Sequence, residues 1–154
     1  MDAVQQFKVL LGEVNAASGL ALELDDANGC TFPYGGMAFN LTVLPESGYV
    51  LLYATLGYLG DDQNASGRAK WLLEANDAQL GSNGFTLALD EETNRVFAID
   101  RRLVADLVDA DAFAGWLEML DECVGDVRRT MEVKFPYVDD DPADADEIKI
   151  TEVE

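Results

Sequence analysis

Residues 51–100 combine apolar patterns that only a fold with both a sheet and helices can satisfy. The stretch opens with LLYATLG, an apolar run that predicts a strand, and continues to WLLEAN, which predicts a short helix. It ends with GFTLALDEETNRVFAID, where two alternating segments around a polar turn predict paired strands. None of these patterns assembles a catalytic site, so the stretch indicates a surface for contact with another protein.

The residues before this stretch predict one helix and further strands. Asp2 can cap a helix whose apolar face has helical spacing and which Gly19 ends, the face being formed by Val4, Phe7, Leu11 and Val14. Alternating apolar residues predict strands at 20–24 and 37–43, and the apolar run 49–56 predicts a strand covered on both faces. Residues 30–34 fit either a short strand or an extended link.

The residues after the stretch predict a long helix and then an acidic tail. Asp109 or Asp111 can cap a helix with a continuous apolar stripe, made of Phe113, Trp116, Leu117, Leu120, Cys123, Val124 and Val127. Residues 57–67 read as a loop, and the middle helix runs from about Asn64 or Ser66 to Asp77. After Pro136 acidic residues dominate, which favours a flexible tail with one possible edge strand at 147–153.

The predicted fold class is α+β, in the order α-β-β-β-α-β-β-α. A twisted, mainly antiparallel sheet is flanked by helices, and residues 1–135 form one domain followed by a tail over 136–154. The 154 residues with 49% hydrophobic content suffice for a core without disulfides or metals.

The charge of the chain narrows its partners. Thirty acidic against ten basic residues give a net charge of −20, which repels nucleic-acid phosphates and anionic membrane surfaces. The same charge would attract a basic partner or keep an apolar surface soluble, and the sequence leaves both readings open. No apolar run is long enough for a membrane span, and MDAVQQFKVLL lacks the basic start of a signal peptide.

The composition argues against an enzyme. The chain has no histidine, which excludes histidine bases and histidine metal ligands, and its carboxylate pairs lie in predicted turns. We therefore expect no catalytic residues, no metal and no cofactor. Cys30 and Cys123 stand far apart and are expected to be free, buried thiols in a reducing cytoplasm.

Apolar residues remain once one face of each element is buried. On the middle helix a second apolar flank, formed by Trp71, Ala75 and Ala78, suggests contact with a second copy of the chain. Elsewhere the candidates for binding a partner are Val9, Leu10, Met37, Phe39 and Tyr53, and a free strand edge is another candidate.

These elements resemble one protein family. The opening amphipathic helix, LALELDDANGC, YVLLYATLG, WLLEAN, GFTLALDEETNRVFAID and FAGWLEMLDECV match, in order, the small acidic type III secretion chaperones of the Tir-chaperone (CesT) class. The resemblance covers Met1 to about Arg129. The acidic tail and the loop at 57–67 depart from it.

The resemblance implies a homodimeric bacterial cytoplasmic protein. Such a chaperone binds the N-terminal segment of a secreted effector in partly extended form, keeps it secretion-competent and uses no ATP. Carried onto this chain, it implies an effector groove lined by Phe7, Leu10, Leu11, Met37, Phe39, Leu41 and Tyr53. It implies a dimer interface formed by Trp71, Leu72, Ala75 and Ala78.

Two other classes of function stay open at this point. An acidic inhibitor or immunity-type protein would block a basic partner, with binding that depends strongly on salt. A small enzyme or ligand-binding domain that uses a carboxylate would require a deep, enclosed pocket.

Overall fold

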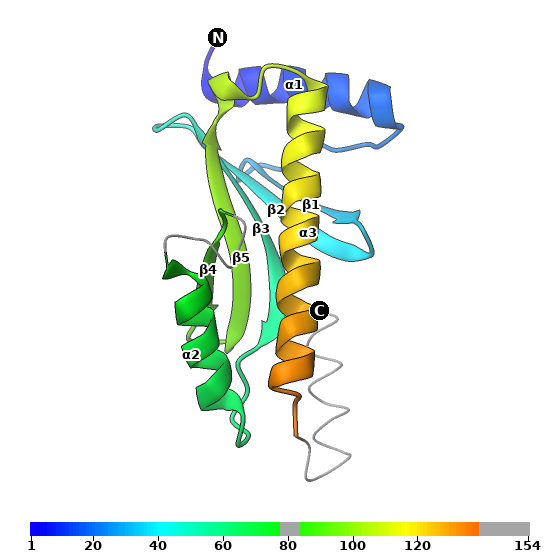
Figure 1. Ribbon diagram of the computed structural model, residues 1–154. Coiled ribbons are helices and arrows are strands. Elements are labelled where there is room, and N and C mark those ends of the chain that lie inside the picture. The colour runs from blue at the N-terminus through cyan, green and yellow to red at the C-terminus, as the bar shows by residue number, and fades with distance from the viewer. Residues whose placement is uncertain (78–83, 139–154) are drawn as a thin grey trace. The chain divides into compact units, whose positions relative to one another are not determined.

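The computed structural model describes residues 1–77 and 84–138, and Figure 1 shows their arrangement. The elements in chain order are α1 (Ala3–Ser18), β1 (Gly29–Tyr34), β2 (Met37–Leu44), β3 (Tyr49–Tyr58), α2 (Ala65–Ala75), β4 (Thr86–Asp90), β5 (Arg95–Leu103), the short 3-10 helix η2 (Val104–Asp106) and α3 (Ala110–Lys134). The strands form one sheet in the order β1-β2-β3-β5-β4. The predicted class and the order α-β-β-β-α-β-β-α are confirmed.

The chain forms two compact units. Unit 1 contains residues 1–54 and 99–123, and unit 2 contains residues 55–98 and those from 124 onward. β3, β5 and α3 each pass from one unit into the other. The predicted division at residues 135 and 136 stays a prediction, because residues 139–154 lie outside the described part of the chain.

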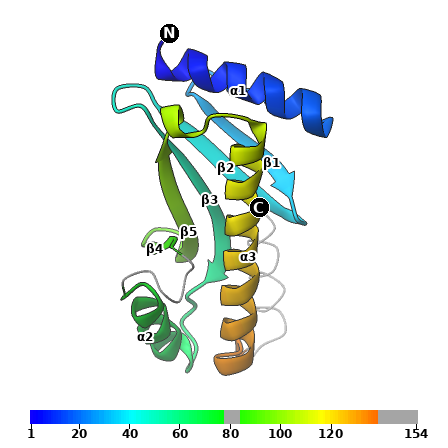
Figure 2. The ribbon, with the colours of Figure 1, turned by 45° about the horizontal axis from the view of Figure 1, so that its top comes forward.

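In unit 1, α1 packs against β2 and η2 (Figure 2). The side chain of Asp2 accepts a hydrogen bond from the backbone N–H of Gln5 at 2.8 Å, which caps the first turn as predicted. Gly19 ends the helix with φ of 75°, and its N–H donates to the carbonyl of Asn15. The buried face consists of Phe7, Leu10, Leu11 and Val14.

The strand predicted at Leu20–Leu24 is wrong, because these residues form an irregular link and β1 lies at Gly29–Tyr34 instead. The side-chain amide of Asn15 donates to the carbonyl of Leu22 and accepts from its N–H, both at 2.9 Å. A buried backbone needs such partners, and a strand is only one way to provide them. The alternation of Leu20, Leu22 and Leu24 therefore reflects burial of one side of the link.

β1 and β2 form a two-residue hairpin in which Tyr34 pairs with Met37. Gly35 and Gly36 at its tip have φ of 58° and 82°, the left-handed conformations that such a tight turn requires. β2 continues antiparallel to β3, with Phe39 opposite Ala54 and Leu41 opposite Leu52.

Only one face of β3 is buried, whereas the apolar run at residues 49–56 predicted burial of both faces. Val50, Leu52, Ala54 and Leu56 are at most 3% exposed, whereas Tyr49, Leu51, Tyr53 and Thr55 are half-buried. Helices cover the buried face within unit 1: the rings of Phe7 in α1 and Phe113 in α3 meet edge to face at 6.0 Å. Trp116 of α3 is fully buried, and its indole N–H donates to the carboxylate of Asp100 at 2.9 Å.

In unit 2, α2 is joined to the edge strand β4 by its C-cap residue. The side-chain amide of Asn76 donates to the carbonyl of Leu87 at 3.0 Å and accepts from its N–H at 2.9 Å. This repeats the arrangement of Asn15 and Leu22, but here the bonded leucine belongs to a strand. α2 therefore takes up the backbone groups of Leu87 that β5 does not pair.

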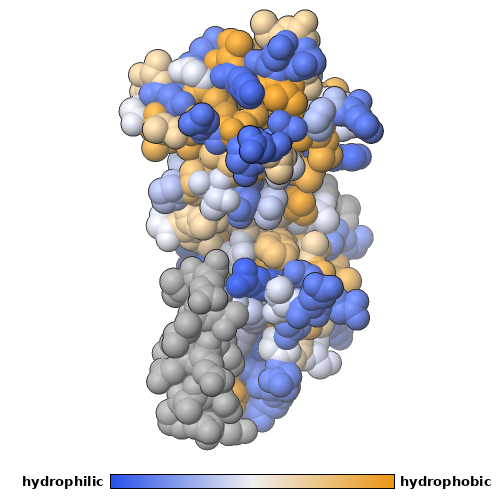
Figure 3. Space-filling view, turned by 180° about the vertical axis from the view of Figure 1, so that it is seen from behind, coloured by the Kyte–Doolittle hydropathy of each residue, from blue (hydrophilic) through white to orange (hydrophobic). Residues whose placement is uncertain are grey.

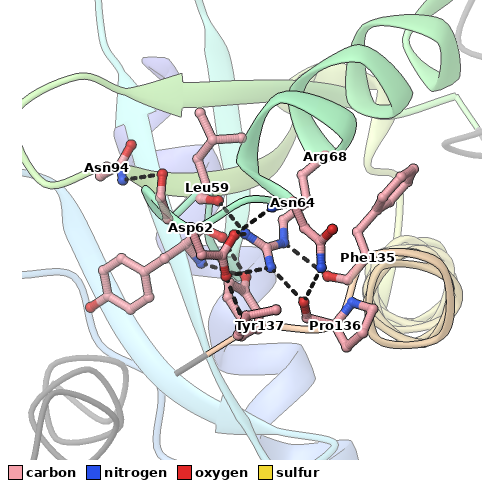
Figure 4. A network of polar contacts seen from close by, with 11 residues as sticks. Leu59, Asp62, Asn64, Arg68, Asn94, Phe135, Pro136 and Tyr137 are labelled. Carbon is pink, nitrogen blue, oxygen red and sulfur yellow. Dashed lines mark hydrogen bonds and ion pairs between the residues drawn. The ribbon is translucent and has the colours of Figure 1, made fainter. Parts of the chain in front are cut away.

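A fully buried arginine holds together three segments of unit 2 (Figure 4). The guanidinium of Arg68 donates to both carboxylate oxygens of Asp62, at 2.8 and 2.9 Å. Its remaining N–H groups donate to the carbonyls of Leu59, Phe135 and Pro136 at 2.8 to 3.0 Å. Five hydrogen bonds thus satisfy all five donors of a charge that has lost its contact with water.

The same cluster fixes the chain just after α3. The ring of Tyr137 lies 3.9 Å from the guanidinium carbon of Arg68, and its hydroxyl donates to the carbonyl of Tyr58. The N–H of Val138 donates to Asp62 at 2.8 Å, and the side chain of Asn64 donates to the carbonyl of Pro136 at 2.7 Å. Residues 136–138, which the sequence assigns to the tail, are therefore part of the packed structure.

Asp62→Asn should destabilise the fold at neutral pH by about 3–5 kcal/mol, because it leaves the buried Arg68 without its counter-charge. The exposed neighbour Asp61 supplies the control Asp61→Asn, which should leave the free energy of unfolding almost unchanged. Urea unfolding of the two variants measures the difference. Equal stabilities would contradict a structural role for the ion pair.

The effect of Asp62→Asn should also depend on pH. Hydrogen bonds from Arg68 hold the pKa of the Asp62 carboxyl below its ordinary value, although partial burial acts in the opposite direction. A lowered pKa stabilises the folded state above the unfolded value of about 3.9, and this contribution is lost as the pH falls through the folded value. The stability gap between the chain and the variant should therefore narrow below about pH 4.

Two helical glycines provide a matched pair for testing the packing beside Arg68. A Cβ on Gly67 of α2 would lie 2.7 Å from the ring of Phe135, whose carbonyl is held by Arg68, whereas a Cβ on Gly115 of α3 would meet nothing within 4 Å. Gly67→Ala should lower the free energy of unfolding by about 1–3 kcal/mol. Gly115→Ala should raise it by about 0.5–1 kcal/mol, since alanine favours a helix. Thermal unfolding of both variants gives the signs, and a stabilising Gly67→Ala would refute the close contact.

Candidate functional site

The described residues offer several surfaces that a protein partner could contact. Among residues 1–77 and 84–138, no group of three or more histidine, cysteine or acidic side chains is placed to hold a metal ion. Within the same ranges no helix is long and apolar enough to cross a membrane. Cys30 is half-buried and Cys123 is buried, and the two are not joined in a disulfide.

Most of the residues predicted to line the effector groove build the core of unit 1. Five of them are at most 5% exposed: Phe7, Leu10, Leu11, Phe39 and Leu41. Met37 and Tyr53 are half-buried. The structure therefore does not bring the seven together on one surface, because the face of β2 that carries Phe39 and Leu41 is the face that the helices cover.

On the opposite face of the sheet in unit 1, β2 and β3 carry half-buried side chains, some of them apolar and some polar. Asn40 of β2 pairs with Tyr53 of β3, and Thr42 pairs with Leu51, so these four side chains are neighbours on the outer face. The hydroxyl of Thr31 in β1 donates to the side chain of Asn40 at 2.8 Å. Figure 3 views the molecule from behind, and orange and blue side chains are interleaved in unit 1.

An aromatic–cation pair lies at one end of this outer face. The guanidinium carbon of Arg101 lies 4.7 Å from the centre of the Tyr49 ring, and both side chains belong to unit 1. Arg101 is exposed, so it adds a positive charge to the surface of a strongly acidic chain. A partner that binds this face meets tyrosine rings, leucine, amides and one guanidinium, which suits an apolar peptide with polar side chains interspersed.

The tip of the β1–β2 hairpin carries a perturbed tyrosine. Burial raises the pKa of the Tyr34 hydroxyl, and the negative charges of Glu118 and Asp121 on α3 raise it further. The ring of Tyr34 contacts Phe39 at 5.2 Å. A tyrosine with a raised pKa stays protonated at neutral pH, so Tyr34 is a hydrogen-bond donor and not a base.

In unit 2 an apolar groove separates α2 from β4. Its lining is almost entirely apolar and consists of Leu59, Ala69, Leu72, Leu73, Asn76, Leu87, Ala88, Leu89 and Val96. Two leucines on its rim project into solvent, Leu73 with 74% and Leu89 with 51% of its surface exposed. An exposed leucine pair beside an apolar groove is typical of a surface that another protein covers.

Of the predicted dimer residues that the structure describes, Leu72 lines this groove, whereas Trp71 and Ala75 do not. Leu72 and Ala75 are buried, at 8% and 7% exposure, and Trp71 is half-buried. Ala78 lies outside the described residues. Leu73 and Leu89 were missed because Leu73 shares a helical face with Leu72, and Leu89 continues the alternation of Phe85 and Leu87. The sequence pattern identifies the apolar face of each helix or strand, but not how far the burial of that face extends.

Comparisons with known proteins agree with surfaces that bind another protein. The model of the Tir chaperone protein (CesT) family matches residues 10–124. Among curated proteins, none matches at a significant level.

Solved structures with a similar fold come from complexes of two proteins. The structure titled as the HopA1-SchA chaperone-effector complex aligns with a TM-score of 0.69 and 19% identity over 82% of this chain and 96% of that chain. The ExsC-ExsE complex aligns with a TM-score of 0.67 and 20% identity over 84% and 96%. The ExoU-SpcU complex from the type III secretion system of Pseudomonas aeruginosa aligns with a TM-score of 0.59 and 20% identity over 75% and 93%.

At these identities the solved structures establish the fold, and the family match establishes the relationship. The family match covers more than half of the chain, including all of β1 to β5. The resemblance that the sequence motifs suggest is thereby confirmed. The chain belongs to the Tir chaperone protein (CesT) family of type III secretion chaperones.

Proposed function

We propose that the protein is a homodimeric type III secretion chaperone of the bacterial cytoplasm. It binds the N-terminal chaperone-binding segment of a cognate effector, keeps that segment soluble and secretion-competent, and uses no ATP. The observation that carries this proposal is the outer face of β2 and β3, where the apolar side chains of Leu51 and Tyr53 are half-buried. Binding is the whole mechanism, since nothing in the described residues suggests chemistry.

The client segment contacts the outer face and not the core. Leu51 and Tyr53 supply apolar surface, while Asn40 and Thr42 between the paired strands supply hydrogen-bonding groups. An extended segment placed there shields its own apolar side chains without a folded structure of its own. The similar HopA1-SchA structure is a complex of a chaperone with its effector, which supports the same mode of action for this chain.

The two edges of the sheet differ in their capacity to accept a client strand. At β4 the side chain of Asn76 already bonds both backbone groups of Leu87. At β1 residue 33 is a proline, which is tolerated on a strand whose N–H would otherwise face outward. Strand addition is therefore favoured at β1, where an incoming peptide can pair with Thr31.

The homodimer forms through the groove between α2 and β4. Leu73 and Leu89 are exposed on the rim of an apolar groove, and a two-fold axis would insert each leucine into the groove of the partner. The net charge of −20 keeps the remaining surface from unspecific association. Leu73 and Leu89 therefore join Trp71 and Leu72 as proposed interface residues.

Leu73→Asp should convert the dimer to a monomer, because the dimer would bury an unpaired carboxylate at its interface. Val133→Asp is the control, since Val133 is 82% exposed on α3 and does not line the groove. Light scattering gives the solution mass of both variants at micromolar concentration. A dimer that persists in Leu73→Asp refutes this interface, and a monomeric unmodified chain refutes the dimer.

Tyr53→Asp should weaken client binding by about tenfold or more, because a charge replaces an aromatic contact at the centre of the outer face. The chain is co-expressed with the product of the adjacent gene, and the fraction that co-purifies is measured. Val108→Asp is the control, since Val108 is 77% exposed in unit 1 outside this face. Phe39 is unsuitable for the test because it is fully buried and its replacement would damage the core.

Three outcomes of the co-expression are informative. The proposed site is supported if the unmodified chain and Val108→Asp retain the N-terminal part of the adjacent product and Tyr53→Asp does not. Equal retention by all three places the client elsewhere. A chain that is monomeric and retains no product fits an acidic inhibitor of a basic partner better than a chaperone.

A further inference from the structure

The turn that precedes β1 has the geometry of a β-hairpin. The N–H of Asp25 donates to the carbonyl of Gly29 at 2.8 Å, and the N–H of Asn28 donates to the carbonyl of Asp25 at 3.0 Å. Asn28 has φ of 62°, the left-handed conformation that closes a three-residue hairpin loop. Such a turn normally connects two paired strands, but here only the residues after the turn form a strand, which is β1.

The segment before the turn also matches β1 in register. Extending the pair Asp25–Gly29 would place Glu23 opposite Thr31 and Leu22 opposite Phe32. Leu22 and Phe32 are both buried, at 8% and 3% exposure, so their side chains already lie on the same side. The segment 20–24 thus has the alternation, the turn and the register of a strand beside β1 but is not one.

The gap between this segment and β1 is open. A groove of about 380 Å³ is lined by residues 20–23 and 25 on one wall and by residues 29–33 on the other. Because Gly29 turns its carbonyl toward the segment, strand alternation turns the backbone groups of Thr31 and Pro33 the same way. Thr31 and Glu23 have no backbone hydrogen bond across the groove.

Asn15 of α1 holds the segment in its position. Its two hydrogen bonds to Leu22, both 2.9 Å, reach the backbone groups that face away from β1. Pairing with β1 would use the groups of Glu23, so the tether and the pairing do not compete for the same atoms. The tether instead fixes where the segment lies, and in that position the groove of about 380 Å³ stays between the segment and β1.

We propose that Asn15 is a positioning residue that holds residues 20–24 off the edge of β1, so that this edge stays open for an extended strand of the client. The inference rests on the proposed chaperone function and adds how its strand-docking site is kept free. The segment 20–24 is the competing occupant, held off by two hydrogen bonds.

The lining of the groove sets the chemistry of the strand that fits. On the buried side Leu22, Cys30 and Phe32 accept apolar side chains at alternate positions. On the open side Glu23 and Asp25 are exposed acids, and the carboxylate of Asp25 is already bonded to the N–H groups of Ala27 and Gly29. A strand with apolar residues alternating with neutral or basic ones therefore fits, and an acidic strand is repelled.

Hydrogen exchange of the free protein tests the tether without a client. The backbone amide hydrogen of Thr31 should exchange fast in the unmodified chain. In Asn15→Ala, where the released segment pairs with β1, it should exchange at least about tenfold more slowly. The control Asn76→Ala removes the equivalent contact to Leu87 and should leave Thr31 unchanged. Strong protection of Thr31 in the unmodified chain overturns the inference, as does fast exchange in a folded Asn15→Ala.

A disulfide lock gives a second test if Asn15→Ala does not fold. Glu23→Cys and Thr31→Cys, combined with Cys30→Ala, can form a bridge only when the segment lies against β1. The probe is an N-terminal fragment of the adjacent product, and its binding to the unmodified chain is measured alongside. Reduced protein should bind it and oxidised protein should bind at least about tenfold more weakly.

The outcomes of this second test distinguish a failure of the inference about the β1 edge from a failure of the proposed chaperone function. Equal binding by the reduced and oxidised forms overturns the docking edge and leaves the chaperone function standing. Loss of binding in both forms, while the unmodified chain also fails to retain the fragment, counts against the proposed function and the inference together.

Discussion

Buried backbone groups outside helices and strands must still be hydrogen-bonded, and Arg68, Asn15 and Asn76 are among the side chains that meet this requirement here. Arg68 takes the carbonyls of Leu59, Phe135 and Pro136 in unit 2. Asn15 and Asn76 each take both backbone groups of one leucine. Because these contacts connect the ends of helices to links and edges, they decide where loops lie and which strand edges remain available.

Periodicity predicted much of the fold for a clear physical reason. Helical spacing marked α1 and α3, and alternation marked β2, β4 and β5, since each element buries one face. The same reasoning failed at residues 20–24, because an extended link that buries one side alternates just as a strand does. Only the partner of the Leu22 backbone distinguishes the two, and that partner, Asn15, carries no periodic signal.

The predicted binding residues illustrate a related limit. The family resemblance implied a groove at Phe7, Phe39 and their neighbours, but large apolar side chains are equally suited to a core. The residues that remain accessible are less conspicuous in sequence: Leu51 and Tyr53 alternate with buried positions, and Leu73 stands beside Leu72. Which apolar face is covered depends on how the helices pack, and that is a tertiary property.

The two asparagines use the same chemistry at opposite edges of the sheet with different consequences. Asn76 bonds a leucine that is already part of β4, so its amide occupies an edge that would otherwise attract another strand. Asn15 bonds a leucine that has not joined β1, so its amide keeps a ready-made strand away from an edge. A chaperone that works by binding extended segments requires one accessible edge that its own chain does not fill, and the difference between Asn15 and Asn76 provides it.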